Sequence, residues 1–191
     1  MKKCSTSLDG VHLLQATVIE DDRGGFSEFF KSSTFEDLGL PSQFLQDNYS
    51  TSHRGVVRGL HFQVHPFAQG KLVTCVRGAI YDVVVDLRPG STSFGKWVSV
   101  ELSEDRFEAL YVPEGFAHGF QSLENQSGVF YKCTNVYSKA HEEGIVYNDP
   151  ELEICWPLPS PIVSSKDLEL PSFEEWKRKG QVDEHAENEH D

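Results

Sequence analysis

The sequence has no long apolar stretch, no paired cysteine motif and few basic residues. No window approaches the roughly 20 apolar residues that span a membrane. The N-terminal MKKCSTSLDG lacks the apolar run of a signal peptide. The four cysteines form no C-x-x-C pair, which favours free thiols and predicts a cytoplasmic protein. Lysine and arginine number 17 against 30 acidic residues, and the formal net charge of −13 argues against nucleic-acid or anionic-membrane partners.

The overall composition is typical of a globular protein. Hydrophobic residues make up 38% and aromatic residues 12% of the 191 residues, a length typical of one domain. We assign residues 1–180 to this domain. Residues 181–191 are polar and acidic, and we expect them to form a disordered tail.

A succession of short strand-like runs, separated by turn residues, occupies the middle of the chain. The runs are Phe44–Ser50, Val56–Gln63, Lys71–Arg77, Ala79–Leu87, Lys96–Leu102, Leu110–Val112, Gly119–Leu123 and Val129–Val136. Many short strands with regular turns predict an antiparallel β-sandwich or barrel.

The flanking segments are less regular. Residues 1–9 read as a loose lead-in, and Val11–Ile19 and Phe26–Lys31 as strands around the turn DDRGG. Short helices are predicted at Ser33–Leu38, Ser165–Leu168 and Pro171–Lys179.

The stretch Gly55–Lys71 carries more polar side chains than an ordinary core strand. Alternation places His61 and Gln63 on one face, where His61 is a candidate base, metal ligand or structural residue. Strict alternation puts Arg58 on the opposite face, unless Gly59 marks a β-bulge that turns both side chains inward. Lys71 is a candidate cation beside His61.

A metal site is the first alternative for these histidines. The pattern Pro113-x-Gly115-x-x-His118 resembles the second half of a cupin signature, so a site of His61, His65 and His118 is conceivable. The first half of that signature requires a His-x-His pair, and Gln63 occupies its second position. We therefore predict that no metal is bound.

Two further residues are candidates for acid–base chemistry. Tyr131 lies on a strand face that points inward, either as an acid opposite His61 or as a core tyrosine bonded to the backbone. Asp167 orients the His61 ring if the chain folds back to it, and is otherwise solvated or a cap. Three basic residues, Arg23, Arg58 and Lys71, are candidates for binding an anionic ligand such as a diphosphate.

These residues belong to an ordered series of motifs. The series comprises Arg58–Gln63, Gly70–Val73, Asp82–Arg88, Ser93–Gly95, Val112–Phe120, Tyr131–Thr134, Asp149-Pro150, Trp156-Pro157 and Ser165–Asp167. Together they resemble the dTDP-4-dehydrorhamnose 3,5-epimerase family, over nearly the whole domain.

The resemblance implies a fold, a ligand and a set of roles. The fold is all-β: a cupin-like antiparallel β-sandwich or jelly-roll barrel with a few short helices, mainly near the C-terminus, without metal or other cofactor. The implied catalytic residues are His61 as base with Asp167, Tyr131 as acid, and Lys71 as stabiliser of the intermediate. The residues implied to bind the nucleotide-sugar are Arg23, Phe26, Glu28, Gln46, Asn48, Arg58, His118 and Tyr137. The resemblance further implies a homodimer in which the N-terminal segment, with Arg23, serves the neighbouring site.

The implied activity is inversion at C3 and C5 of dTDP-4-dehydro-6-deoxyglucose through an enolate. Relatives that act at one centre, or on other nucleotide sugars, keep the same base, acid and lysine, so a mono-epimerase is an alternative. A metal-dependent cupin and a non-catalytic sugar-nucleotide binding module are the other two hypotheses.

Overall fold

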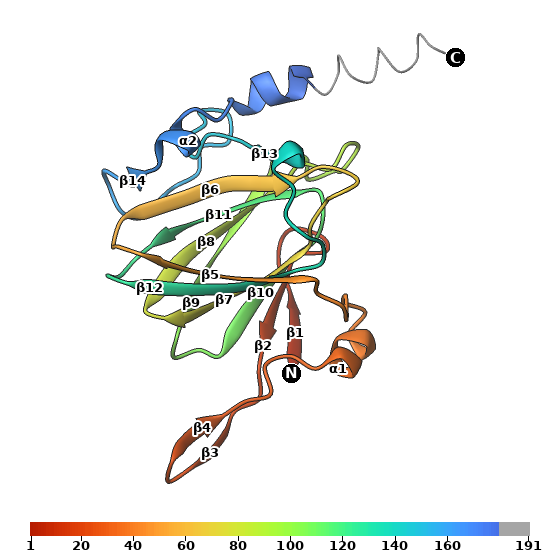
Figure 1. Cartoon of the computed structure of the whole chain (residues 1–191), viewed down its shortest axis with the longest axis vertical. Coiled ribbons are helices and arrows are strands. Elements are labelled where there is room, and N and C mark those ends of the chain that lie inside the picture. Colours follow the sequence, from red (N-terminus) through yellow and green to blue (C-terminus); the bar gives the residue numbers. More distant parts are fainter. Residues whose placement is uncertain (180–191) are drawn as a thin grey trace.

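Two antiparallel β-sheets packed face to face form the body of the molecule (Figure 1). The structure, a computed structural model, describes residues 1–179. The first sheet contains, in spatial order, β1 (Lys2–Ser5), β2 (His12–Gln15), β10 (Glu108–Val112), β7 (Lys71–Arg77), β12 (Ser127–Cys133) and β5 (Gln46–Ser52). The second contains β13 (Glu142–Gly144), β6 (Val56–Gln63), β11 (Phe116–Ser122), β8 (Ala79–Asp86) and β9 (Trp97–Ser103), with β14 (Ile162–Val163) parallel to β6. The predicted all-β sandwich is confirmed.

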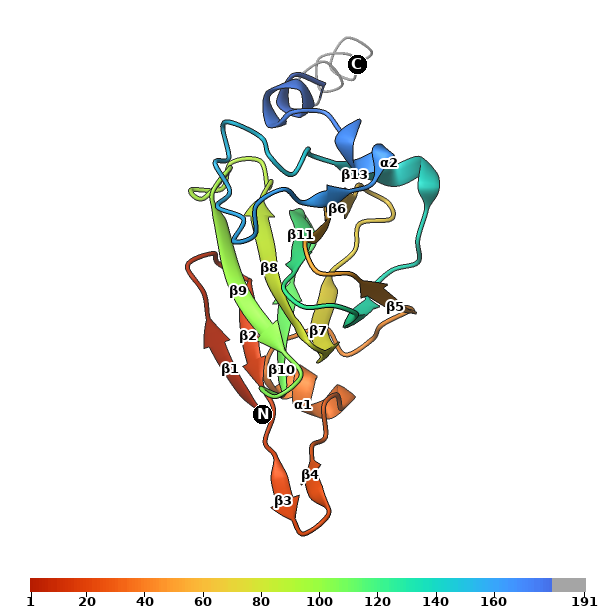
Figure 2. The same cartoon turned by 90° about the vertical axis from the view of Figure 1, so that its left-hand side faces the viewer.

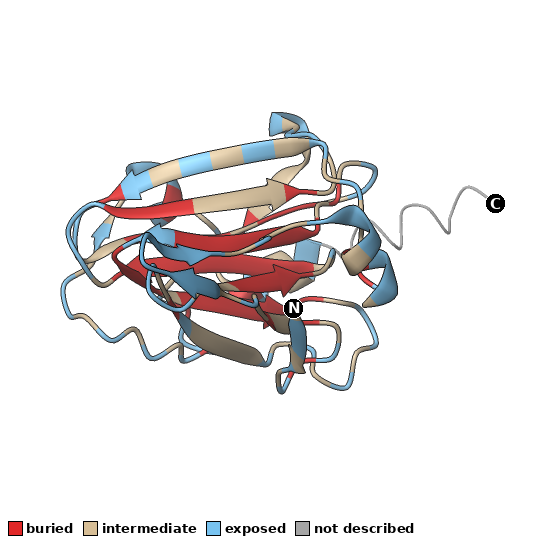
Figure 3. Ribbon diagram, turned by 90° about the horizontal axis from the view of Figure 1, so that it is seen from below, coloured by how far each residue is buried: buried red, intermediate tan, exposed pale blue. Residues whose placement is uncertain are grey.

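The main core lies between the sheets. Val73, Leu110 and Val129 of the first sheet pack against Val84 and Phe120 of the second. Figure 3 shows that burial is concentrated in these central strands. Toward one end of the sandwich the inward-facing residues become polar, and a cavity opens there between the sheets.

The outer faces of both sheets are covered in part by other segments. Residues after β13 pack on β6 and β8, which explains why β8 is buried on both faces and reads as a nearly continuous apolar run. Helix α1 (Ser32–Asp37) covers the first sheet with its buried Phe35, in contact with Leu14 and Leu72.

Two short strands, β3 (Ile19–Asp21) and β4 (Gly24–Phe26), form a hairpin that projects away from the sandwich (Figure 2). Every residue of both strands is exposed. The hairpin makes a separate two-stranded sheet and adds nothing to the core of its own chain.

Several boundary predictions are wrong, and the largest differences lie near the N-terminus. The lead-in of residues 1–9 includes β1, which pairs with β2. The strand predicted over Val11–Ile19 stops at Gln15 and resumes only with β3. Of the strand predicted over Phe26–Lys31, only Phe26 belongs to a strand, as the last residue of β4, and the residues after it form a loop up to α1. Its apolar spacing arises because Phe30 packs edge-on against Phe35 and Phe44 beside α1.

The C-terminal predictions fare better. Ser165–Leu168 is helix α2, and residues 173–179 are helical, within the predicted range Pro171–Lys179. The predicted acidic tail, 181–191, lies outside the described residues. None of the helices within residues 1–179 has the length and apolar character to cross a membrane. All four cysteines are unpaired, as predicted.

Candidate active site

A cavity of about 700 Å³ opens between the ends of the two sheets. One wall comes from β6 and β11 of the second sheet, and the other from β5, β7 and β12 of the first. Helix α2 and β14 border it beside β6 (Figure 1). The predicted site residues that line it are His61, Lys71, Tyr131, Asp167, Gln46, Asn48, Arg58, His118 and Tyr137.

His61 and Asp167 meet in this cavity although 106 residues separate them in sequence. The Nε2 atom of His61 lies 2.8 Å from Oδ1 of Asp167, while Oδ2 accepts a hydrogen bond from the N–H of Gly59. Burial opposes ionisation of this carboxyl, but the hydrogen bonds and charge of His61, with the Gly59 N–H, hold the pKa of Asp167 below its ordinary value. The carboxylate therefore fixes the orientation of the ring through Nε2, and Nδ1 is the ring nitrogen not engaged by Asp167.

A β-bulge in β6 brings Arg58 to the same cavity. His61 pairs with His118 and Arg58 with Phe120 of β11, so two residues of β6 lie opposite the single residue Gly119. Gly59 has φ +116°, and a Cβ there would lie 2.7 Å from the Cα of Gly119. Of the two readings that the sequence left open for Arg58, the structure therefore has the one in which Gly59 marks a bulge.

Lys71 and Tyr131 occupy the wall opposite His61, on the neighbouring strands β7 and β12. The Nζ atom of Lys71 donates to the main-chain oxygen of His61 at 3.0 Å, which places the cation next to the candidate base. Burial lowers the pKa of Lys71 from its ordinary value and raises the pKa of Tyr131 from its own. Tyr131 is therefore held as a neutral phenol, the form that can donate a proton.

His118 forms a second histidine–aspartate pair with a residue to which the sequence analysis gave no role. Its Nε2 atom lies 2.5 Å from Oδ1 of Asp82, whose side chain is fully buried on β8. Within residues 1–179 the other carboxylate oxygen of Asp82 has no hydrogen-bond partner. The strand register explains the contact. His118 of β11 pairs with Val84 of β8, and Asp82 lies two residues before Val84, so both side chains are on the same face of the sheet. Only knowledge of strand pairing could have revealed it.

A polar chain runs along the cavity mouth. The amide of Gln46 donates to Asn48 and accepts from the N–H of Tyr137, and Asn48 donates to the sulfur of Cys133. The Tyr137 hydroxyl donates to Glu142 at 2.7 Å, and Glu142 also accepts from Lys166 at 2.6 Å.

Glu142 and Lys166 line the cavity but were missed by the sequence analysis. Burial opposes ionisation of Glu142, yet the hydrogen bonds from Lys166 and Tyr137 keep the pKa of its carboxyl below the ordinary value. Lys166 directly precedes Asp167, and that adjacency was the available signal. Glu142 follows an irregular stretch of sequence, which contained no signal that it would line the cavity.

Three predicted binding residues lie elsewhere. Arg23, Phe26 and Glu28 belong to the projecting hairpin or follow it, and none lines the cavity in the described chain. Arg23 pairs with Asp21 within the hairpin turn. Phe26 and Glu28 instead border a smaller cavity of about 320 Å³ at the hairpin base.

The three histidines of the metal alternative do not converge. His65 is exposed and lies outside the cavity lining, which contains His61 and His118. Among the described residues, no group of three or more histidine, cysteine, aspartate or glutamate side chains has an arrangement that could hold a metal ion.

Comparison with known proteins gives consistent matches. The dTDP-4-dehydrorhamnose 3,5-epimerase of Escherichia coli K12 is 47% identical over 177 residues, covering 92% of this chain and 96% of that one. The Legionella pneumophila dTDP-6-deoxy-D-glucose-3,5-epimerase, solved with dTDP-4-keto-L-rhamnose, is 40% identical with a TM-score of 0.86, covering 91% and 93%. A 3'-monoepimerase from Streptomyces bikiniensis, solved with dTDP-quinovose, is 35% identical with a TM-score of 0.87, covering 92% and 89%.

The two-sheet fold, with a partly buried histidine–aspartate pair in a cavity between the sheets, is that of a β-sandwich isomerase. Residues 5–175 match the family described as dTDP-4-dehydrorhamnose 3,5-epimerase. The chain belongs to the dTDP-4-dehydrorhamnose 3,5-epimerase family.

Proposed function

We propose that the protein inverts C3 and C5 of a nucleotide-linked 4-keto-6-deoxyhexose, with dTDP-4-dehydro-6-deoxyglucose as substrate and dTDP-4-dehydrorhamnose as product. The observation that carries this proposal is the placement of His61, paired with Asp167, on one sheet and of Tyr131 and Lys71 on the other. Inversion at carbon requires a base and an acid on opposite sides of the sugar ring, and the two walls of the cavity supply them.

The chemistry begins with the ketone at C4, which acidifies the protons at C3 and C5. His61 removes one of them through Nδ1, because Nε2 is engaged by Asp167, and the carboxylate stabilises the imidazolium that forms. The ammonium of Lys71 stabilises the enolate oxygen as negative charge develops there. Tyr131 then delivers a proton from the opposite face, and the centre is inverted.

Binding of the nucleotide-sugar is assigned to the polar residues around this centre. Arg58 is exposed at the cavity and has its guanidinium oriented by the Ser52 hydroxyl and the Thr51 carbonyl, so it presents donors to a diphosphate. Tyr137, half-exposed at the mouth, offers a ring for the base. The remaining members of the binding set are Gln46, Asn48 and His118.

Arg23, Phe26 and Glu28 serve the site of a second copy in this proposal. The projecting hairpin exposes Ile19 and Phe26 by 65% and 67%, which is unusual for large apolar side chains and suits a surface covered in a homodimer. A cytoplasmic location fits the four unpaired cysteines, since thiols persist in a reducing compartment.

The decisive test is solvent exchange during turnover. Incubation of dTDP-4-keto-6-deoxyglucose with the protein in D₂O should incorporate deuterium at both C3 and C5, read by NMR, and the variant His61→Asn should not. Absence of exchange at both centres would refute the proposal.

A mono-epimerase is the second candidate, favoured by the likeness to the Streptomyces bikiniensis 3'-monoepimerase. The same spectra decide between the two candidates. Deuterium at one centre only, with no second inversion after prolonged incubation, identifies the single-centre enzyme.

A further inference from the structure

Asp167 lies outside both sheets, on a segment with little regular structure of its own. Helix α2 has four residues, and before it only the two-residue strand β14 joins the segment to β6. The Ser164 side chain caps α2 by accepting from the Asp167 N–H. Besides the bonds from Gly59 to Asp167 and from Lys166 to Glu142, the position of α2 depends on how the chain is held on its far side.

Polar contacts hold the chain directly after α2. The N–H of Val146 donates to the oxygen of Pro171 at 2.9 Å, and the N–H of Phe173 donates to Oδ2 of Asp149 at 2.8 Å. Asp149 is 3% exposed and is itself held by the N–H groups of Glu151 and Leu152. The helical residues 173–179 thus begin from a defined point on the second sheet's outer layer.

Trp176 then connects this segment to the strand that carries the base. Its ring lies nearly parallel to Phe173, at 6.1 Å and 12°, and meets Phe62 edge-on at 5.6 Å and 89°. Its Nε1 donates to Glu143 of β13 at 2.8 Å. Phe62 directly follows His61 in β6, and Phe173 lies on the segment that continues from α2, so one indole contacts both the strand that carries His61 and the chain that leaves α2.

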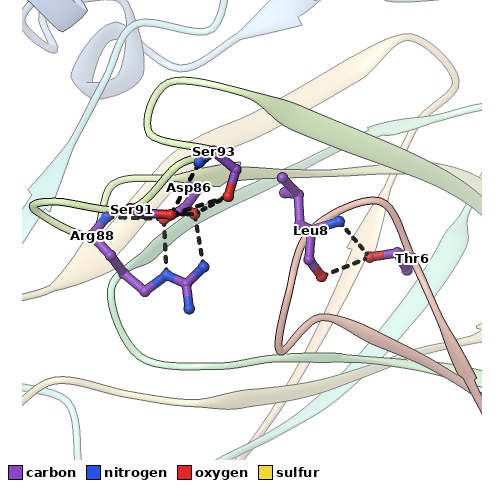
Figure 4. Close-up of polar contacts among 6 residues, drawn as sticks. All are labelled: Thr6, Leu8, Asp86, Arg88, Ser91 and Ser93. Atoms are coloured by element: carbon purple, nitrogen blue, oxygen red, sulfur yellow. Dashed lines mark hydrogen bonds and ion pairs between the residues drawn. The ribbon is translucent and has the colours of Figure 1, made fainter.

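A loop with its own hydrogen-bond network contacts the other side of the aromatic group. Phe94 packs on Phe173 at 5.4 Å. Its loop is held by Asp86, which is fully buried and accepts hydrogen bonds from Arg88, Ser91 and Ser93 (Figure 4). The loop and the C-terminal segment therefore meet through the rings of Phe94, Phe173 and Trp176.

We propose that Trp176 is a positioning residue that, with Phe94 and Phe173, holds α2 so that Asp167 keeps its contact with the His61 ring. Trp176 is not among the described residues that line the cavity, so its effect is exerted through Asp167. The kinetic part of the test rests on the proposed function, and the spectroscopic part does not.

The first test compares Trp176→Leu with a matched variant, Trp156→Leu. Trp156 is also half-buried in the layer outside the second sheet and donates Nε1 to Tyr147, but it packs on Tyr81 and Tyr147 instead. Because small displacements of a catalytic group are costly, we expect Trp176→Leu to lower kcat about tenfold with KM changed less than about twofold. Trp156→Leu should change kcat by less than about twofold.

The second test repeats the substitution in an Asp167→Asn background. If Trp176 acts through Asp167, Trp176→Leu should lower kcat there by less than about twofold, since coupled residues are not additive. Equal losses in both backgrounds would mean a general structural role and overturn the proposal. If Trp176→Leu fails to fold, Phe94→Leu takes its place in this test. It is a milder change, because the ring is 36% exposed, and it should show the same pattern.

The third test needs no turnover. The imidazole Nε2–H resonance of His61, recorded on ¹⁵N-histidine-labelled protein, should be protected from exchange in the wild type and in Trp156→Leu, and lost in Trp176→Leu. An unchanged signal in Trp176→Leu contradicts the proposal. A wild type without turnover but with this pattern would refute the epimerase activity and leave the positioning role supported.

Discussion

At the scale of residues, the cavity is organised around both ends of His61. Its ring is bonded to Asp167 through Nε2, and its main-chain oxygen accepts from Lys71. The base and the cation are thus held by one residue in one geometry. A displacement of β6 would disturb proton abstraction and enolate stabilisation together.

Lys71 should govern the alkaline side of the pH profile. Burial lowers its pKa, so the ammonium is lost at a lower pH than for an exposed lysine, and kcat should fall there. Tyr131, whose pKa is raised by burial, stays protonated over the same range. The profile of kcat against pH checks this, and Lys71→Met should lower kcat by about 10²–10³ and remove that fall. An unaltered alkaline limb in Lys71→Met would contradict the assignment.

The same lysine affects stability with a defined sign. Its folded-state pKa lies below its unfolded value, so the unfolded chain binds more protons between the two values. The contribution of Lys71 to the free energy of unfolding therefore increases as pH rises through that window. Denaturation of wild type and Lys71→Met at several alkaline pH values should show the difference.

Tyr131→Phe should separate exchange from inversion. His61 can still remove a proton and return it to the same face, so deuterium should enter C3 or C5 while inversion falls by about 10²–10⁴. NMR of the recovered sugar distinguishes exchange with retention from exchange with inversion. Loss of exchange and inversion in equal measure would show that Tyr131 has another role.

The residues found from sequence are polar side chains on predicted strands. His61, Lys71 and Tyr131 lie on such strands, and for His61 and Tyr131 alternation indicated which residues share their face. Asp82 also lies on such a strand, but its function depends on pairing with His118 across the sheet. Glu142 lies after an irregular segment without periodicity. Contacts made by tertiary pairing have no local signal.

At the scale of elements, the bulge in β6 is the feature that assembles the site. It turns Arg58 and His61 toward one cavity, and the Gly59 N–H it exposes holds Asp167. A glycine within an otherwise regular strand was enough to raise the bulge as an alternative to strict alternation, but not to decide between them. The two-residue β14 and the three-residue β13 have no strand signal in the sequence, because they are strands only through their pairing with β6.

Gly59→Ala should disrupt this element. The new Cβ would lie 2.7 Å from the Cα of Gly119, at a φ of +116°, and should lower the free energy of unfolding by about 2 kcal/mol or more. Gly55→Ala is the matched control: φ is +86° but no atom lies within 4 Å, so only backbone strain of about 1 kcal/mol is expected. Chemical denaturation of both variants measures the difference, and equal losses would rule out the close contact as the cause.

At the scale of the whole molecule, the projecting hairpin leaves the site of a single chain without three of its expected binding residues. The strands could be predicted from alternation, but the contribution of Arg23 to a site could not, since in the proposed homodimer it depends on a second chain. The resemblance to a family supplied that expectation.

Mixing two inactive variants should restore activity if copies share sites. Arg23→Ala keeps His61, and His61→Asn keeps Arg23, so a mixed dimer contains one complete site. Co-refolded in equal amounts, the pair should recover about a quarter of the wild-type activity, because half of the dimers are mixed and each has one competent site of two. Each variant refolded alone is the control. No recovery in the mixture would contradict a shared site.

The separation of 106 residues between His61 and Asp167 also has a consequence for how the molecule matures. The base lies in the first half of the chain, and its partner is added only after every strand of both sheets has been synthesised. Closing so long a loop has an entropic cost, and contacts between distant residues are associated with slow folding. Catalytic competence is therefore acquired late, and turnover becomes a sensitive reporter of a completely folded chain.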